Sequence, residues 1–313
     1  MSENSNIKSK KKKSNRRKLI LVLVLLALCI AAVIYIFAFS RANGRAGEEV
    51  QENTEITSET ENTASESTSE SAAEDAEGES NAATEHVYSH RGSQGEDELS
   101  FAAYDRAVEA GSKYIEADMV VSADGTIYVA HDDESKAMTG YDGYFSGMKD
   151  SQIDQLTTRA GNKVPKLTDL FEKYGDRVNY IIDIKYSSQR NITAFTETVK
   201  GSGLEDNIIA ASFYSNALMP LEETFPDMPK LYLCGDQGAF NAALGFEYAD
   251  ILCVPASILT EDNLKAAHDN GKKFSVWTLN TEEEIKNAIE TGVDSYFTDD
   301  TELAIKLEKE NRH

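Results

Sequence analysis

The sequence predicts an α/β fold: a TIM-type (β/α)8 barrel, preceded by one transmembrane helix and a disordered acidic linker. Short apolar runs with strand character alternate with stretches of helical spacing from residue 86 onward. The 228 residues of 86–313 are close to the length of about 250 residues that one such barrel needs. An abrupt change of composition before residue 86 separates this barrel domain from an N-terminal region of different character.

The N-terminal region begins with a basic tail, residues 1–18, in which eight Lys or Arg lie between Lys8 and Lys18. The next residues, 19–39, are uncharged and almost wholly apolar, and a helix of this length would span about 30 Å, the thickness of a hydrocarbon core. Basic flanks stay on the cytoplasmic side. We therefore expect a single-pass protein of the cell membrane with a cytoplasmic N-terminus and an extracytoplasmic barrel domain. A signal peptide cleaved near Ala38-Phe39-Ser40 is the alternative.

Residues 40–85 form the predicted linker. From residue 41 onward this segment holds thirteen acidic residues, two arginines and almost no large apolar side chains. Such a composition cannot bury enough apolar area to offset the entropy of folding, and its like charges repel one another. We expect a disordered, extended tether.

The barrel domain is strongly acidic. Residues 1–40 contribute +7 and residues 41–85 contribute −11, so the total of −23 leaves −19 for residues 86–313. This balance argues against a nucleic-acid partner, because such binding depends on Lys and Arg neutralising phosphates. Cys29 lies in the apolar run, while Cys234 and Cys253 are expected to be buried reduced thiols that could be neighbours in the barrel.

Nine short apolar runs are strand candidates, one more than the barrel needs. In chain order they begin at Val87 and Tyr114 and continue as Ile127–Ala130, Tyr180–Ile184, Ile208–Phe213, Leu231–Leu233, Ile251–Val254, Lys273–Thr278 and Ser295–Thr298. No helix fits between the second and the third candidate, where Ala123-Asp124-Gly125-Thr126 is typical of a tight turn. One of the nine must therefore be irregular.

Helical spacing is found in five stretches between the strand candidates. They are Leu99–Ala110, Leu167–Tyr174, Ile192–Lys200, Glu261–Asn270 and Glu282–Thr291. Gly111, Gly271 and Gly292 follow three of them, in the position where helices usually end.

Three polar clusters follow the first three strand candidates: His90-Arg91-Gly92, Glu116-Ala117-Asp118 and His131-Asp132. Each is expected where a strand opens into a loop, at the rim on which barrel active sites are built. Glu116 and Asp118 are two apart on one strand, so both point from the same face and could hold one cation. His90 and His131 supply two groups for proton transfer. This set of residues suits the cleavage of a charged substrate.

The order of these clusters resembles the glycerophosphodiester phosphodiesterase family, and the resemblance covers essentially all of residues 87–300. Its first part consists of His90-Arg91-Gly92, Glu98, the run Gly111-Ser112-Lys113-Tyr114-Ile115-Glu116-Ala117-Asp118, Asp124-Gly125 and Val129-Ala130-His131-Asp132. Its second part consists of Ile182-Asp183-Ile184-Lys185, Ser212-Phe213, Val276-Trp277-Thr278-Leu279-Asn280, Gly292-Val293-Asp294 and Thr298-Asp299. The resemblance implies a TIM-type barrel, a divalent cation, and hydrolysis of a phosphodiester to glycerol 3-phosphate and an alcohol.

The resemblance also implies roles for individual residues. Glu116, Asp118 and Asp183 would hold one Mg²⁺ or Ca²⁺, with Asp183 in place of the usual Glu, and an all-oxygen site argues against zinc. Arg91 and Lys185 would bind the substrate phosphate, His90 and His131 would be the catalytic acid and base in an unassigned order, and Trp277 would form a wall against the glycerol. Asp183 with Lys185 could instead be a structural ion pair, and Trp277 could be plain packing. Glu98 is expected to position a neighbour or cap a helix, not to ligate metal.

Two other functions remain open. One is a barrel of the phospholipase C or D type that acts on intact lipid, which membrane tethering favours. The other is a catalytically idle barrel that binds a polyol phosphate, which only the Asp183 substitution favours. The small-molecule substrate is expected to be a glycerophosphodiester or a glycerophosphate polymer, and the sequence does not specify the alcohol that is released.

Overall fold

The computed structural model describes residues 85–311. The basic tail and the apolar run expected to be a membrane helix, residues 1–18 and 19–39, lie outside the described residues, as does the linker except for Glu85. Within residues 85–311, none of the helices combines the length and the apolar character that crossing a bilayer requires. The membrane helix therefore stays a prediction.

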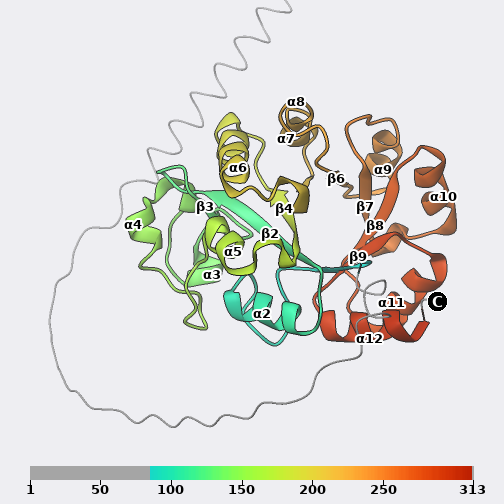
Figure 1. The fold of residues 1–313 in the computed structure, drawn as a ribbon, viewed down its shortest axis with the longest axis horizontal. Coiled ribbons are helices and arrows are strands. Elements are labelled where there is room, and N and C mark those ends of the chain that lie inside the picture. Colours follow the sequence, from blue (N-terminus) through green and yellow to red (C-terminus); the bar gives the residue numbers. More distant parts are fainter. Residues whose placement is uncertain (1–84, 312–313) are drawn as a thin grey trace, which may run out of the picture. The chain divides into compact units, whose positions relative to one another are not determined.

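Eight parallel strands form the closed barrel that the sequence predicted (Figure 1). They are β1 (Val87–Ser89), β2 (Tyr114–Val121), β4 (Asn179–Ile184), β5 (Ile208–Ser212), β6 (Lys230–Leu233), β7 (Ile251–Pro255), β8 (Lys273–Trp277) and β9 (Ser295–Thr298). Neighbours in this order pair in parallel, and β1 pairs with both β2 and β9, which closes the ring. The carboxyl ends of all eight strands consequently meet at one rim.

The ninth strand candidate is the irregular one. β3 (Ile127–Val129) pairs antiparallel with the end of β2, with Met119 opposite Val129 and Val121 opposite Ile127. The turn between them is held by a hydrogen bond from the Ser122 amide to the Thr126 carbonyl, 2.9 Å long. This hairpin returns the chain to the barrel rim at residue 130, so it positions the histidine that follows.

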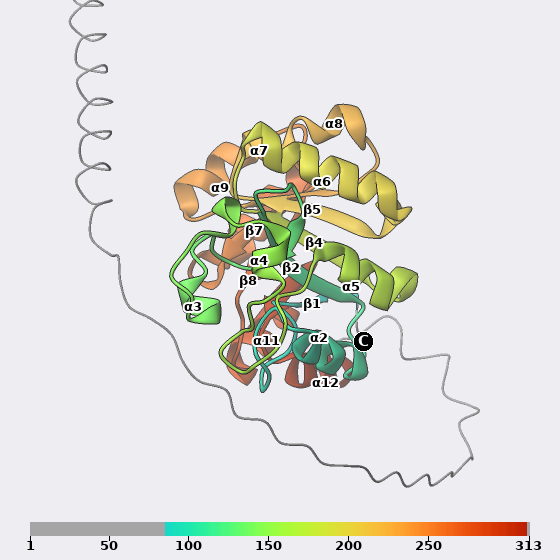
Figure 2. The same cartoon turned by 90° about the vertical axis from the view of Figure 1, so that its left-hand side faces the viewer.

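The helices lie outside the ring of strands (Figures 1 and 2). They are α2 (Phe101–Glu109), α3 (Lys136–Thr139), α4 (Asp150–Ile153), α5 (Leu167–Tyr174), α6 (Gln189–Ser202), α7 (Ser215–Leu218), α8 (Leu221–Thr224), α9 (Gln237–Ala243), α10 (Glu261–Asp269), α11 (Glu282–Thr291) and α12 (Thr301–Asn311). Short 3-10 turns occupy Phe145–Gly147, Gly175–Arg177, Glu205–Asn207 and Ala256–Ile258. Together with β3, α3 and α4 lie to one side of the barrel, left in Figure 1.

The helix boundaries follow from capping side chains. α2 begins after Ser100, whose hydroxyl accepts a hydrogen bond from the Ala103 amide, and α11 begins after Thr281, which forms a capping box with Glu284. α11 ends at Gly292, which adopts a left-handed conformation with φ of 82°. All five predicted helices are confirmed, and two of them, α5 and α11, have the predicted bounds.

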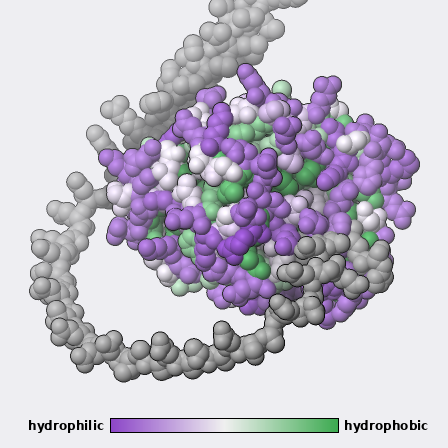
Figure 3. All heavy atoms as spheres, viewed as in Figure 1, coloured by the Kyte–Doolittle hydropathy of each residue, from purple (hydrophilic) through white to green (hydrophobic). Residues whose placement is uncertain are grey.

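The hydrophobic core is contained within the barrel domain. The buried residues of its four clusters run from Val87 to Leu307 and come from the strands and from the inner faces of the helices. Polar and charged side chains cover most of the face drawn in Figure 3, with apolar ones gathered near its centre. Because the closed sheet and its core are complete within this segment, we expect residues 86–313 to fold on their own.

The acidic residues of β2 and the two buried cysteines bear on expectations from the sequence. Glu116 and Asp118 share one strand, as expected, but they do not lie where that strand opens into a loop, because β2 continues to Val121. A strand tolerates such charges where they point inward and are paired, as described below. Cys234 and Cys253 are buried free thiols within the described chain, as expected, and the Cys234 amide donates to the Cys253 carbonyl at 2.8 Å.

Candidate active site

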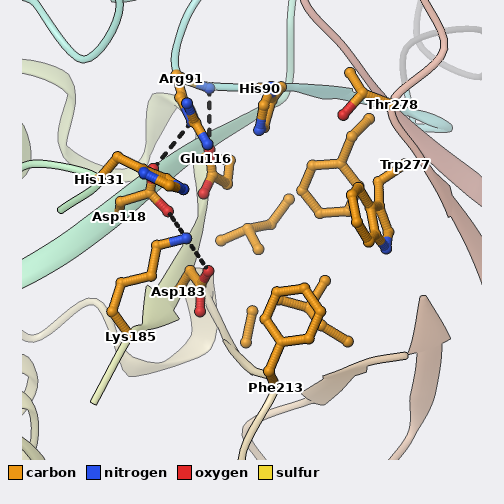
Figure 4. A pocket seen from close by; sticks show the side chains of 14 residues that line it. His90, Arg91, Glu116, Asp118, His131, Asp183, Lys185, Phe213, Trp277 and Thr278 are labelled. Atoms are coloured by element: carbon orange, nitrogen blue, oxygen red, sulfur yellow. Dashed lines mark hydrogen bonds and ion pairs between the residues drawn. The ribbon is translucent and has the colours of Figure 1, made fainter. Parts of the chain in front are cut away.

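A pocket opens at the carboxyl ends of the barrel strands (Figure 4). Its lining consists of His90, Arg91, Glu116, Asp118, His131, Ile181, Asp183, Lys185, Ala211, Phe213, Leu233, Trp277, Thr278 and Phe297. Every residue predicted to take part in the site therefore lies in one cavity. The structure brings these residues together at the rim, while the chemical role of each stays a prediction.

His90 and Arg91 follow β1 directly, in a tightly fixed loop. The His90 amide donates to the Thr298 carbonyl at 2.9 Å, which ties the loop to β9. Arg91 has a positive φ of 56°, and Gly92 has a φ of 95° and lies so close to α2 that a Cβ there would be 2.5 Å from the Cβ of Ala103. The glycine of the His-Arg-Gly motif is therefore required by both backbone conformation and space.

The His90 ring is oriented by a chain of hydrogen bonds. Its Nδ1 lies 2.6 Å from Asp299 Oδ1, and Asp299 Oδ2 accepts from the Asn280 side-chain amide at 2.6 Å. Burial alone would raise the pKa of Asp299, but the bond to His90 lowers it below the ordinary value. Asp299 is consequently an anion that can only accept, so His90 carries its proton on Nδ1 and presents Nε2 for proton exchange.

Three carboxylates come together from two adjacent strands. Glu116 and Asp118 lie on β2, Asp183 lies on β4, and the pairing of the strands sets Asp118 beside Asp183. All three side chains are buried, and one oxygen from each lies within 4.8 Å of the others. Because residues two apart on a strand share a face, the sequence alone could predict the Glu116–Asp118 pair, while the third member depends on strand register.

Two cations balance these carboxylates. Lys185 Nζ lies 2.7 Å from both Asp118 and Asp183, and Arg91 Nε lies 3.1 Å from Asp118. The Arg91 amide also donates to Glu116 at 3.0 Å, and Arg91 Nη1 is held by Glu98 at 3.0 Å. Glu98 therefore positions Arg91; it does not cap α2, whose cap is Ser100.

Burial and the neighbouring charges shift the pKa values of the three carboxyl groups in different directions. Burial, reinforced by Asp118, raises the pKa of Glu116 well above its ordinary value. Burial also raises the pKa of Asp183, to about 6, despite the opposing effect of Lys185. For Asp118 the attraction of Lys185 and Arg91 exceeds the effect of burial and lowers the pKa.

The acidic triad fits a divalent cation. Three carboxylates provide oxygen donors, which Mg²⁺ and Ca²⁺ prefer. Within residues 85–311, Asp183 Oδ1 is buried and has no hydrogen-bond partner. A buried oxygen with no partner is costly, and a cation would satisfy it. The triad could thus bind one metal ion.

His131 is less constrained than His90, and its side chain lies beside Asp118 in Figure 4. Its Nδ1 is 3.1 Å from Asp132, and the two side chains are 42% and 62% exposed. The side chain of His90, by comparison, is 21% exposed. The two histidines therefore differ in their surroundings, which the sequence did not reveal.

The pocket has a charged half and an apolar half. Figure 4 shows the charged side chains facing Phe213 and Trp277 across the cavity. The ring centroids of Phe213 and Trp277 are 5.9 Å apart in an edge-to-face arrangement. Along the chain, the charged residues all fall within residues 90–185 and the apolar ones within residues 211–297, with Ile181 as the exception.

Sequence reasoning assigned no role to Asp299, Asn280 or Phe213. Asp299 follows the end of β9 as His90 follows the end of β1, so its position at the rim was the available signal. Pairing it with His90 was not possible from sequence, because the two are 209 positions apart. Trp277 lies at the pocket, as predicted.

Comparison with known proteins provides an independent finding. The model of the Glycerophosphoryl diester phosphodiesterase family matches residues 90–303. A glycerophosphodiester phosphodiesterase of Caldanaerobacter subterraneus subsp. tengcongensis is 28% identical over 236 residues, which cover 71% of this chain and 96% of the relative.

Solved structures agree with the fold. A glycerophosphodiester phosphodiesterase of Thermotoga maritima superimposes with a TM-score of 0.60 and 27% identity, over 71% of this chain and 97% of the other. A phosphodiesterase of Oleispira antarctica, solved in complex with the product sn-glycerol-3-phosphate, superimposes with a TM-score of 0.65 and 21% identity, over 72% and 96% of the two chains.

Proposed function

The chain belongs to the glycerophosphoryl diester phosphodiesterase family, and on that basis we propose that it hydrolyses glycerophosphodiesters to glycerol 3-phosphate and an alcohol with the help of one divalent cation and two histidines. The family and the curated relatives establish the enzyme class, a phosphoric diester hydrolase. One observation supports the finer mechanism most strongly: His90, His131 and the Glu116–Asp118–Asp183 triad line the same cavity.

Arg91 and Lys185 are proposed to bind the phosphate. Both are already held at the carboxylates, so their positive charges are aimed at the place where an anionic group would lie. A guanidinium can contact two phosphate oxygens at once, while a lysine acts as a point charge. The glycerol is proposed to pack against Trp277, whose ring forms part of the opposite wall.

Proton transfer is assigned to the two histidines. Because Asp299 fixes the Nδ1 proton of His90, its Nε2 is free to accept a proton, which suits a general base. By elimination, His131 would donate a proton to the leaving alkoxide. The proton that His90 accepts would come from a glycerol hydroxyl, which forms a new P–O bond to give a cyclic phosphate as the P–O bond to the alcohol breaks. Water then opens the cyclic phosphate, with the two histidines exchanging roles, so one water is consumed and the products are glycerol 3-phosphate and the free alcohol.

The acidic triad would hold Mg²⁺ or Ca²⁺ through Glu116, Asp118 and Asp183. Such a cation, when bound, neutralises negative charge that develops on phosphate oxygens. Asp183 has a shorter side chain than glutamate and keeps a free buried oxygen for this purpose.

The competing functions are less well supported. An idle polyol-phosphate barrel does not require an oriented histidine, yet His90 is fixed by Asp299 and Asn280. A phospholipase would cleave intact two-chain lipid and leave glycerophosphocholine uncleaved, so the choice of substrate separates it from the proposed function. Anchoring of the enzyme in the cell membrane through residues 19–39, with the barrel outside the cytoplasm, remains part of the proposal and rests on the apolar run and the basic tail before it.

The test is release of glycerol 3-phosphate from glycerophosphocholine by residues 86–313, with Mg²⁺, with Ca²⁺ and with chelator. We expect release that depends on the cation and is lost in His131→Ala, while His268→Ala serves as a matched control, because His268 lies away from the pocket and pairs with Asp294. A folded domain that leaves glycerophosphodiesters intact with either cation would refute the proposal, and diacyl phospholipid would be tested next.

A further inference from the structure

The loop that follows His131 is closed at Asp133, two residues further on. Both carboxylate oxygens of Asp133 accept hydrogen bonds from Ser146, thirteen positions later in the chain: Oδ1 from the Ser146 amide at 2.7 Å and Oδ2 from the Ser146 hydroxyl at 2.6 Å. The Asp133 carbonyl also accepts from the Phe145 amide at 2.8 Å. Asp133 therefore fastens the start of this loop to its far end.

Phe145 joins the closed loop to the hydrophobic core. Its side chain is fully buried, in the same core cluster as Ala130. Ala130 directly precedes His131, and its amide donates to the Asp118 carbonyl at 3.1 Å. The backbone of His131 consequently lies between two fixed points, Ala130 on one side and Asp133 on the other.

A further contact reaches Asp133 from the end of β4. The Asp133 amide donates to the Tyr186 hydroxyl at 3.3 Å, although the two residues are 53 positions apart. Tyr186 directly follows Lys185, which is proposed to bind the phosphate. Asp133 thus ties the loop of His131 to the part of the rim where the phosphate would lie.

The His131 side chain has weaker constraints of its own. It pairs with Asp132, and the two side chains are 42% and 62% exposed. Exposed pairs of this kind contribute little, because solvent screens them and both side chains lose freedom. The place of the imidazole is therefore set mainly by the backbone that carries it.

We propose that Asp133 is a positioning residue for His131. It fixes the backbone from which the imidazole reaches the oxygen of the leaving alcohol. Asp133 does not line the pocket, so it acts through His131 and not on the substrate. This inference rests on the proposed function, in which His131 donates a proton to the leaving group.

The first test compares two substitutions of Asp133 in the full chain. Asp133→Ala removes both acceptors of the Ser146 bonds, and we expect kcat/KM for choline release from glycerophosphocholine to fall about 10- to 100-fold, since a misplacement of 1 Å can cost about 10²-fold. Asp133→Asn keeps an oxygen for the Ser146 amide and gains an NH₂ group that can donate to the Ser146 hydroxyl, so we expect it to stay within about threefold of the parent enzyme. Unchanged activity in Asp133→Ala would refute the proposal.

Asp142→Ala is the matched control, because it removes a carboxylate from the same loop. Asp142 pairs with Lys136, and its side chain is 76% exposed. Loss of such an exposed pair is expected to change kcat/KM less than about threefold. A fall as large as that of Asp133→Ala would show that any change in this loop impairs the enzyme, and would contradict a particular role for Asp133.

A change of leaving group separates positioning of the acid from a general effect on the fold. The glycerol 3-phosphate ester of p-nitrophenol releases a stabilised phenolate that leaves without a proton, so its cleavage does not need a general acid. The value of kcat/KM for release of the leaving group reports only the steps through cleavage of its P–O bond. Asp133→Ala, like His131→Ala, is expected to lose about tenfold less on this ester than on glycerophosphocholine. Equal losses on both substrates in Asp133→Ala would overturn the positioning role.

Ser146→Ala tests the same contact from its other side and keeps the proposal testable if Asp133→Ala does not fold. It removes the hydroxyl that donates to Asp133 and leaves the amide bond in place. We expect a fall of about fivefold on glycerophosphocholine, the effect of one hydrogen bond, and a smaller one on the p-nitrophenyl ester. The same fall on both substrates would count against the proposal.

The outcomes separate the two proposals. If the parent enzyme cleaves both esters and His131→Ala depends on the leaving group while Asp133→Ala does not, the positioning role fails and the proposed function stands. If the parent enzyme cleaves neither ester, the proposed function itself fails.

Discussion

His90 Nδ1 and Asp299 Oδ1 are 2.6 Å apart, although the two residues are separated by 209 positions along the chain. The contact is possible because β1 and β9 are neighbours in the closed ring. It fixes the histidine that the proposed reaction uses as a base.

Asp299→Asn should therefore impair turnover more than binding. An amide can present its NH₂ group to His90 and favour the wrong tautomer, so we expect kcat to fall about 10²-fold, within the range for loss of general acid-base catalysis. The matched control is Asp132→Asn at the exposed partner of His131, with a loss of less than about tenfold. Steady-state kinetics of both variants provide the measurement. Equal losses would contradict a special role for Asp299.

Cation binding should stabilise the fold through the acidic triad. At a cation concentration about 100-fold above its Kd, binding adds about 2.7 kcal/mol to the free energy of unfolding and raises Tm. Asp118→Asn is expected to abolish most of this rise. Asp250→Asn, which replaces a carboxylate at the amino end of β7, is expected to keep it. Thermal unfolding with and without Mg²⁺ or Ca²⁺ measures the effect.

The stability of the metal-free protein should depend on pH in an unusual direction. The pKa of Asp183 is about 6 in the folded protein, against 3.8 for an ordinary aspartate. Between these values the folded state binds more protons than the unfolded state, so the free energy of unfolding from this group falls as pH rises from about 4 to 6. The raised pKa of Glu116 acts in the same direction.

Urea unfolding in chelator at pH 5 and pH 7 checks this expectation, with Asp183→Asn as the variant that should reduce the dependence to the part that Glu116 contributes. The lowered pKa of Asp118 does not interfere, since its effect appears only below the ordinary value of 3.8. Protons and cation compete for the same oxygens, so cation affinity should also weaken below pH 6. Stability that rises between pH 5 and pH 7 in chelator would contradict the assignment.

Gly92→Ala should destabilise the domain and displace Arg91. The new methyl would lie 2.5 Å from the Cβ of Ala103, in a backbone with φ of 95°. Gly111→Ala measures the cost of the positive φ alone, because Gly111 has a similar φ of 100° and an added Cβ there would have no neighbouring atom within 4 Å. We expect Gly92→Ala to lose about 1–3 kcal/mol more than Gly111→Ala, the typical cost of overpacking. Urea denaturation of the two variants compares them directly.

The sequence predicted the barrel because its strands are short, apolar and regularly spaced, and its longer helices carry clear caps and stops. The four-residue helices α7 and α8 are too short to show a helical period. α12, with Ala304 and Ile305 buried, was not among the predicted helices, although its apolar side chains recur at helical spacing. β3 was recognisable as irregular from the tight turn before it, but its antiparallel pairing depends on contacts that one sequence does not display.

The candidate site could be predicted where its residues lie close together along the chain. Glu116 and Asp118 follow from the two-residue period of a strand, and the two histidines follow from their position after apolar runs. The family resemblance supplied Asp183, Lys185 and Trp277. What sequence could not provide was the pairing across the ring, which places Asp299 and Asn280 behind His90 and Lys185 between two carboxylates.

The division of the pocket along the chain has a consequence for how such an enzyme can diverge. The groups proposed to break the bond are encoded before β5, and those proposed to contact the organic part of the substrate are encoded almost entirely after β4. Recombination between relatives at the β4–β5 junction would exchange the residues that contact the organic part of the substrate and leave those proposed to break the bond unchanged. The contact of His90 with Asp299 crosses that junction, so a hybrid gene has to keep this aspartate if the histidine is to stay oriented.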